Sequence, residues 1–204
     1  MHELFETLMA DMPSEVLPTP DSISYYKLEK ERKYYLDCEV DGALMALHRM
    51  ILRWNMEDRG KKPEERQPIW IYIMSPGGEV DVMWALVDVI RLSTTPVHTV
   101  NVGVASSAAS LIFIAGHKRF MTPNAKVVIH EGSAQFGGDA VKVMDFSESY
   151  KKELKKMKQF ISDHTGILPK QLNAKRANDW ELDAAFCMEN KVCDRIIESI
   201  EEVA

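Results

Sequence analysis

The apolar residues of this chain follow two spacings, one typical of buried strands and one typical of amphipathic helices. Residues 69–74 (IWIYIM) are apolar without alternation, as expected of a strand covered on both faces of a sheet. Residues 80–91 then carry apolar side chains at helical spacing. Further strands are predicted at residues 33–38, 97–104, 118–121 and 126–129, and further helices at residues 43–54, 107–115, 140–164, 168–176 and 183–190. Strands that alternate with helices predict an α/β fold with a mainly parallel, buried sheet and flanking helices.

Two segments lack this kind of apolar pattern, and a third, within the helix predicted at residues 140–164, is rich in lysine. Residues 1–20 hold three prolines and several acids, which predicts a mobile N-terminal arm ahead of a single domain spanning residues 21–204. The polar run at residues 57–67 (EDRGKKPEERQ) is predicted to be a loop. The lysine-rich residues 151–158 are predicted to form a solvated helix face.

The composition is that of a globular protein, with 46% hydrophobic and 27% charged residues. The net charge of −6 argues against a nucleic-acid partner, which usually requires a basic surface. Three cysteines without a metal-ligand spacing predict free thiols and no metal site. The acidic start is unlike a secretory signal, and the most apolar window, residues 102–116, is too short to cross a bilayer. We therefore expect a soluble, cytoplasmic protein with no membrane partner.

Two predicted strands end in segments with unusual chemistry. Residues 75–78 (SPGG) place two glycines after a buried strand, which allows close backbone approach to a ligand and an unpaired amide, as an oxyanion hole requires. A tight turn that needs a positive φ explains the same glycines. Residues 103–110 (GVASSAAS) turn from a strand into a helix through small residues, as in a nucleophile elbow. A small-residue helix packed closely on the sheet fits this segment equally.

A serine nucleophile needs a base and an orienting acid. Of six histidines, His130 is the best placed, because it ends a predicted strand and precedes a glycine-rich segment. A structural histidine is an equal explanation for its position. The acid has several candidates, among which the spacing alone does not choose: Asp139, Asp145, Asp179 and Asp183.

The segments IWIYIMSPGG, VGVASSAAS and AGHKRFMTPNAKVVIH together resemble the proteolytic subunit of the Clp protease, over residues 32–194. In that family the first glycine of SPGG supplies one oxyanion amide, which here is Gly77. The family's serine lies in a run like G-M-A-A-S-M-G, and this run matches Ser107 rather than the neighbouring serines. The resemblance also implies that the Ala108 amide is the second oxyanion donor.

The family histidine follows a phrase like K-R-F-x-x-P-N-x-x-V-x-I-H, which matches residues 118–130 and implies that His130 is the base. The family acid comes 49 residues later, which implies Asp179. Asp183 then takes a helix-capping position that the family usually gives to Ser or Thr. The resemblance thus implies a Ser107, His130 and Asp179 triad with no cofactor.

The resemblance further implies a serine endopeptidase that cleaves unfolded polypeptides or short peptides inside an enclosed chamber. An extended substrate is expected to pair with Gly78, Glu79 and Val80 on one side and with Gly132 and Ser133 on the other. Such backbone pairing reads little side-chain identity, so specificity would come mainly from access to the chamber.

The family assembles as homo-oligomeric rings of seven subunits, normally two stacked rings, and an AAA+ unfoldase uses the ATP. The resemblance implies a ClpP/crotonase-type fold, in which residues 140–164 and 135–138 form a protruding helix–strand handle between rings. Asn178 stands where the family usually has an arginine of the ring–ring contacts, and residues before Asp21 do not match the family's axial loops.

Two other functions fit the same fold. One is a catalytically silent ring subunit or scaffold, which the intact triad argues against. The other is a crotonase-like acyl-CoA enzyme, which uses a similar pair of amides but needs no Ser/His/Asp set at these spacings.

Overall fold

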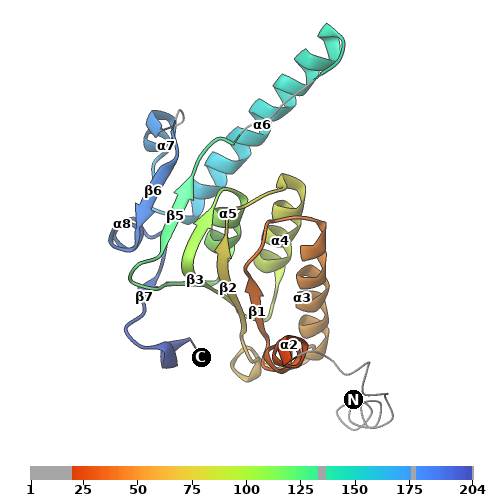
Figure 1. The fold of residues 1–204 in the computed structure, drawn as a ribbon. Helices are drawn as coiled ribbons and strands as arrows, with labels where there is room; N and C mark the ends of the chain where they lie inside the picture. Colours follow the sequence, from red (N-terminus) through yellow and green to blue (C-terminus); the bar gives the residue numbers. More distant parts are fainter. Residues whose placement is uncertain (1–19, 133–136, 176–177, 204) are drawn as a thin grey trace.

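The computed structural model describes residues 20–132, 137–175 and 178–203, with side chains described from residue 23 onward (Figure 1). The predicted arm of residues 1–20 therefore lies outside the described residues, apart from Pro20. The same holds for Ser133 and for the first half of the predicted handle strand at residues 135–138.

A mainly parallel sheet forms the centre of the fold. Its strands run in the order β1-β2-β3-β4-β7, and β5 pairs with both β3 and β6. Only the β5–β6 pair is antiparallel; the other described pairs are parallel. The strands are β1 (Lys33–Leu36), β2 (Ile69–Ser75), β3 (Val97–Ser106), β4 (Lys118–Met121), β5 (Lys126–Ile129), β6 (Trp180–Asp183) and β7 (Arg195–Ile196). This sheet confirms the predicted α/β fold.

Helices α3, α4 and α5 lie on one face of this sheet, and α6 extends well beyond the sheet as a single long rod (Figure 1). The α-helices are α2 (Pro20–Lys30), α3 (Met45–Glu57), α4 (Val80–Leu92), α5 (Ala108–Ala115), α6 (Ala140–His164), α7 (Pro169–Lys175) and α8 (Ala184–Glu189). Short 3₁₀ turns are η2 (Gly42–Leu44), η3 (Pro63–Glu65) and η4 (Ile200–Glu202). Every residue of α5 is buried, because its small and apolar side chains allow it to pack closely on the sheet.

Strand β2 shows why its apolar run lacks alternation. Ile69, Ile71 and Ile73 are fully buried in the main core beneath the helices. On the opposite face Tyr72 is buried in a second, smaller cluster, while Met74 is exposed. The second face is therefore covered only in part, by the C-terminal segment that follows β7.

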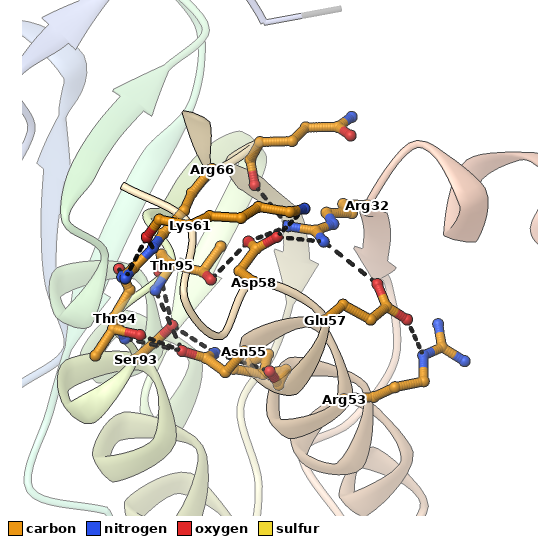
Figure 2. A network of polar contacts seen from close by, with 12 residues as sticks. Arg32, Arg53, Asn55, Glu57, Asp58, Lys61, Arg66, Ser93, Thr94 and Thr95 are labelled. Carbon is orange, nitrogen blue, oxygen red and sulfur yellow. Dashed lines mark hydrogen bonds and ion pairs between the residues drawn. The ribbon is translucent and has the colours of Figure 1, made fainter. Parts of the chain in front are cut away.

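The polar run at residues 57–67 is more ordered than the predicted loop. It contains η3 and the carboxylate of Asp58, which is fully buried. Asp58 belongs to a network of polar contacts (Figure 2). Arg32 donates to both oxygens of Asp58, at 2.5 and 3.0 Å, while Lys61 and Thr95 donate at 2.7 and 2.9 Å. These donors lower the pKa of Asp58, the Arg32 hydrogen bond most strongly. The buried charge is tolerated because it is fully paired, and it ties the start of β1 to the end of α3 and the turn before β3.

One α-helix and two strands were not predicted: α2, β6 and β7. β6 precedes the helix predicted at residues 183–190 and shares only Asp183 with it. Asp183 is the last residue of β6 and the cap of α8, where it accepts the Phe186 N–H at 2.8 Å. The helix-capping prediction for Asp183 is therefore confirmed. The predicted solvated face at residues 151–158 is correct for Lys152 and Lys155 but wrong for Lys158, which is largely buried.

All three cysteines are free, as predicted, and two of them are buried. Burial raises the pKa of Cys187 to about 12 and that of Cys193 to about 11, so neither thiol ionises near neutral pH. Within the ranges given above, no cluster of three or more His, Cys, Asp or Glu side chains could hold a metal ion. No described helix has the length and apolar composition needed to span a membrane.

Candidate active site

Ser107 lies at an abrupt turn between β3 and α5. Its backbone has φ 54° and ψ −125°, a conformation that a residue with a side chain rarely adopts. The turn is held on both sides: the Ser107 N–H donates to the Val128 carbonyl at 2.9 Å, and the Ser107 carbonyl accepts from the N–H and the hydroxyl of Ser110. This strained strand-to-helix turn is the geometry predicted for a nucleophile elbow.

These hydrogen bonds and positions distinguish Ser107 from the two neighbouring serines as the candidate nucleophile. Ser106 is the last residue of β3, and Ser110 is buried with its hydroxyl bonded to the Ser107 carbonyl at 2.6 Å. Ser107 is half-buried and lines a cavity. Among these three serines, Ser107 alone combines the turn geometry with access to the cavity and no hydroxyl partner among the described residues.

Gly77 brings the end of β2 directly against this turn. A Cβ on Gly77 would lie 2.6 Å from the Ser107 Cβ and 3.0 Å from the Ala108 nitrogen, and the φ of Gly77 is 95°. A glycine is therefore required both by the backbone conformation and by the close approach. Ala108 begins α5, where its N–H has no partner within the helix. The Gly77 N–H donates to the Ser75 hydroxyl through a long bond of 3.2 Å.

His130 and Asp179 are brought together by the antiparallel pairing of β5 with β6. Ile129 is paired with Trp180, so the residues just beyond each strand end become neighbours. The distance from His130 Nδ1 to Asp179 Oδ1 is 3.6 Å, longer than a hydrogen bond. The His130 side chain is 31% exposed and the Asp179 side chain is 72% exposed.

The other acid candidates are engaged elsewhere or lie apart from His130. Asp183 caps α8, and Asp139 caps α6 by accepting the Lys142 N–H at 3.0 Å. Asp145 is exposed on α6. Of the four candidates, Asp179 is the one that contacts His130. Strand β6 brings Asp179 to His130 through its pairing with β5. This strand was not predicted from the sequence, because four residues are too few to show the alternation of a strand.

A cavity of about 290 Å³ lies in front of Ser107. Ser107, Ala108, His130 and Gly132 line it together, so the strand ends of β3 and β5 meet at one site. Much of its wall is apolar and comes from α4, α5, α6 and β6, through Val80, Met83, Leu111, Leu154, Met157 and Trp180. Such a wall suits an uncharged side chain of a ligand held beside the serine.

The segment after β2 already pairs along one edge. The Val40 N–H donates to the Gly77 carbonyl at 2.8 Å, and the Glu79 N–H donates to the Val40 carbonyl at 2.6 Å. Backbone groups of alternate residues in an extended segment point to opposite edges, so those of Gly78 face away from Val40. Gly78 is exposed and lines the cavity, whereas Val80 begins α4 and contributes its side chain.

A parallel α/β sheet that presents a serine at a strained strand–helix turn, with a histidine on the same cavity, defines the class as a serine hydrolase. Comparison with known proteins specifies it further, since the family model described as Clp protease matches residues 24–200. The chain therefore belongs to the Clp protease family and is a serine peptidase subunit of that family.

Individual relatives agree with this assignment. The chain is 30% identical over 182 residues to the ATP-dependent Clp protease proteolytic subunit 2 of Corynebacterium diphtheriae, which covers 88% of each chain. The protein of the same name from Rhodococcus jostii is 29% identical over 180 residues, covering 87% of this chain and 89% of the relative. The protein of the same name from Treponema denticola is 34% identical over 143 residues, covering 67% of this chain and 70% of the relative.

Family membership confirms the resemblance seen in the sequence, the fold it implied and the peptidase activity. It does not favour the catalytically silent subunit or the crotonase-like enzyme. Membership also implies an oligomeric protease that works with Clp ATPases.

Proposed function

We propose that Ser107, His130 and Asp179 are the nucleophile, the general base and the orienting acid of peptide-bond hydrolysis. The observation that carries this proposal is the strained turn at Ser107, which places this residue in the wall of a cavity that His130 also lines. The contact between His130 and Asp179 supports the third role.

In this mechanism the Ser107 Oγ attacks the carbonyl carbon of the scissile bond while His130 accepts the hydroxyl proton. The tetrahedral intermediate collapses, the C–N bond breaks, and His130 returns the proton to the leaving amine. Water then hydrolyses the acyl-enzyme by the same route. Asp179 orients the imidazole, and its 3.6 Å contact shortens to a hydrogen bond when substrate is bound.

The N–H groups of Gly77 and Ala108 are proposed to bind the oxyanion that forms on the substrate carbonyl. Ala108 supplies an amide at the start of α5, where the helix dipole favours negative charge. Gly77 exchanges its long bond to the Ser75 hydroxyl for the stronger bond to the oxyanion.

The substrate is proposed to lie extended across the cavity. Gly78 offers a free backbone edge on one side, while Glu79 uses its N–H on Val40 and contributes less. Gly132 lines the cavity on the other side. Ser133 was predicted to pair with the substrate on the same side as Gly132, and it lies outside the described residues. Pairing of this kind accepts many sequences, which suits unfolded polypeptides and short peptides.

The chain is proposed to act in the cytoplasm as a homo-oligomer of seven-membered rings, single or stacked in pairs, together with an AAA+ unfoldase that uses the ATP. Helix α6 supports the assembly because it protrudes from the sheet (Figure 1). Val141 and Met144 near its start are both 69% exposed, and a neighbouring subunit would cover such apolar side chains. The chemistry itself uses only side chains and amides of the chain.

Cleavage of a short fluorogenic peptide by the purified chain tests this proposal. Ser107→Ala is expected to lower kcat by about 10⁴-fold or more while the fold is retained. Ser106→Ala is the matched control, because Ser106 is the adjacent serine within β3, and it is expected to keep most of the activity. Retention of wild-type activity by Ser107→Ala would overturn the assignment. Thioester turnover without peptide cleavage would favour the crotonase-like alternative.

A further inference from the structure

The residue that follows His130 is held by two side chains of α6. The Tyr150 hydroxyl donates to the Glu131 carbonyl at 2.6 Å, and the Lys158 ammonium pairs with the Glu131 carboxylate at 2.5 Å. The side chains of Lys158 and Glu131 are only 24% and 28% exposed. A pair that is largely removed from water is screened less by salt than a surface pair, and it fixes geometry more firmly.

Lys158 also reaches a third element. It donates to the Asn173 side-chain oxygen at 2.9 Å, on helix α7, and α7 ends at Lys175 shortly before Asp179. One ammonium group thus joins α6 to the segment that starts at His130 and to the helix that precedes Asp179. Lys158 lines the same cavity as Ser107. Lys152 on the same helix is exposed and does not line this cavity.

His130 and Asp179 need such support. They lie just beyond the ends of β5 and β6, their contact is 3.6 Å, and Asp179 is largely exposed. Gly132 follows with φ 75°, so Glu131 carries the last side chain before the backbone turns. Burial and the nearby Glu131 carboxylate raise the pKa of Tyr150, which keeps its hydroxyl protonated as a donor.

We propose that Lys158 is a positioning residue for the peptidase reaction: its ion pair with Glu131 and its bond to Asn173 hold His130 and the approach to Asp179 at the cavity beside Ser107. This inference rests on the proposed function. Lys158 takes no part in bond making, and its contribution is to fix where the base and the acid lie relative to the hydroxyl.

The test compares full-length assembled variants. Lys158→Met keeps the length of the stem and removes the charge, Glu131→Gln removes the partner charge, and the double exchange Glu131→Lys with Lys158→Glu reverses the pair. Lys152→Met is the matched control. For each variant we would measure kcat and KM with a short fluorogenic peptide, the rate of fluorophosphonate labelling at Ser107, the melting temperature and the assembled mass.

Lys158→Met and Glu131→Gln are each expected to lower kcat and the labelling rate about 10-fold. This loss is smaller than the ~100-fold loss of rate that a misplacement of one ångström causes. The KM is expected to change less than about 2-fold. The double exchange is expected to regain most of the lost kcat, whereas Lys158→Glu alone is not. Lys152→Met is expected to match the wild type. A purely structural ion pair would also be rescued by charge exchange, but its loss would lower the melting temperature together with kcat, whereas loss of a positioning contact lowers kcat and the labelling rate at a nearly unchanged melting temperature.

Several results would overturn the inference. One is a kcat within about 2-fold of the wild-type value in both Lys158→Met and Glu131→Gln, since misplacement of the base is expected to lower kcat by more than this. Another is a loss in Lys158→Met that accompanies loss of the assembled particle while Glu131→Gln stays fully active. A wild-type chain that is not labelled at Ser107 would instead overturn the proposed function, and this inference with it.

Discussion

The Nδ1 atom of His130 lies 3.6 Å from the Oδ1 atom of Asp179, and the antiparallel pairing of β5 with β6 creates this contact between distant parts of the chain. The pairing places His130 just past the end of β5 and Asp179 just before the start of β6. Strand β5 also pairs with the last residues of β3, directly before Ser107. The register of this short strand pair is enough to bring Asp179 to His130, so that no long loop is needed.

Asp179→Asn is expected to lower kcat by about 10²- to 10⁴-fold, because an amide no longer holds the imidazole in the tautomer that accepts the serine proton. The melting temperature should change little, since the Asp179 side chain is 72% exposed. Peptide hydrolysis and thermal unfolding measured on the same preparation check both parts. Full activity in Asp179→Asn would remove Asp179 from the mechanism.

Gly77→Ala is expected to abolish activity and to destabilise the fold by at least about 1–3 kcal/mol, the usual cost of a strained backbone. The added methyl would lie 2.6 Å from both the Ser106 carbonyl oxygen and the Ser107 Cβ. Gly42→Ala is the control, because nothing lies within 4 Å of a Cβ at Gly42. Denaturant unfolding and peptide hydrolysis should separate the two variants; equal behaviour would contradict the close approach of Gly77 to Ser107.

Asp58→Asn is expected to cost about 3 kcal/mol of unfolding free energy, because it breaks a buried ion pair and leaves Arg32 partly uncompensated. Glu57→Gln, which removes a 45% exposed carboxylate from the same arginine, should cost less than about 1 kcal/mol. The lowered pKa of Asp58 means that its stabilisation is present above its unfolded pKa of about 3.9 and is lost as the pH falls below that value. Urea titrations between pH 3 and pH 7 measure this dependence.

His98 is expected to make the protein less stable in mild acid. Its pKa is lowered to about 4, first by burial and then by Lys118 and His117, and its Nδ1 has no hydrogen-bond partner in the part of the chain that the structure describes. The unfolded chain binds a proton near pH 6.5 and the folded chain does not. Stability should therefore fall as the pH drops from about 6.5 to about 4, by at most about 1.4 kcal/mol per pH unit.

His98→Phe should flatten this acid slope, because the substitution removes the titrating group while keeping an aromatic ring beside Trp70, 4.7 Å from His98 between ring centroids. Unfolding free energies at pH 6.5, 5.5 and 4.5 provide the comparison. An unchanged slope in His98→Phe would assign the acid sensitivity to another group.

The long elements of this fold were predictable from apolar spacing alone. Strand β2 and helices α4 and α6 lie within one residue of the predicted bounds. Strand β2 and helix α4 bury a continuous run or stripe, whereas α6 follows a helical apolar spacing in which only Ile161 is buried. Helix α2 was missed because Ile23, Tyr25 and Tyr26 are exposed, which leaves no buried stripe to recognise. Strand β7 has two residues and carries no period.

The candidate site was predictable in part. The turn at Ser107 and the strand end at His130 follow from local sequence, since both lie where a strand stops. The choice of Asp179 among four acids depended on the resemblance, because it requires the pairing of β6 with β5. The burial of Asp58 was hidden in a polar run, since its partner Arg32 precedes it by a whole helix and strand.

The proposed role of Ser107 is tested most directly by mapping the site of fluorophosphonate modification by mass spectrometry on the intact wild-type chain. One adduct is expected on Ser107 and none in Ser107→Ala, and labelling is expected to be strongly slowed in His130→Ala, because the hydroxyl then lacks its base. An adduct on any other residue, or unchanged labelling in His130→Ala, would contradict the claim that Ser107 is activated by His130.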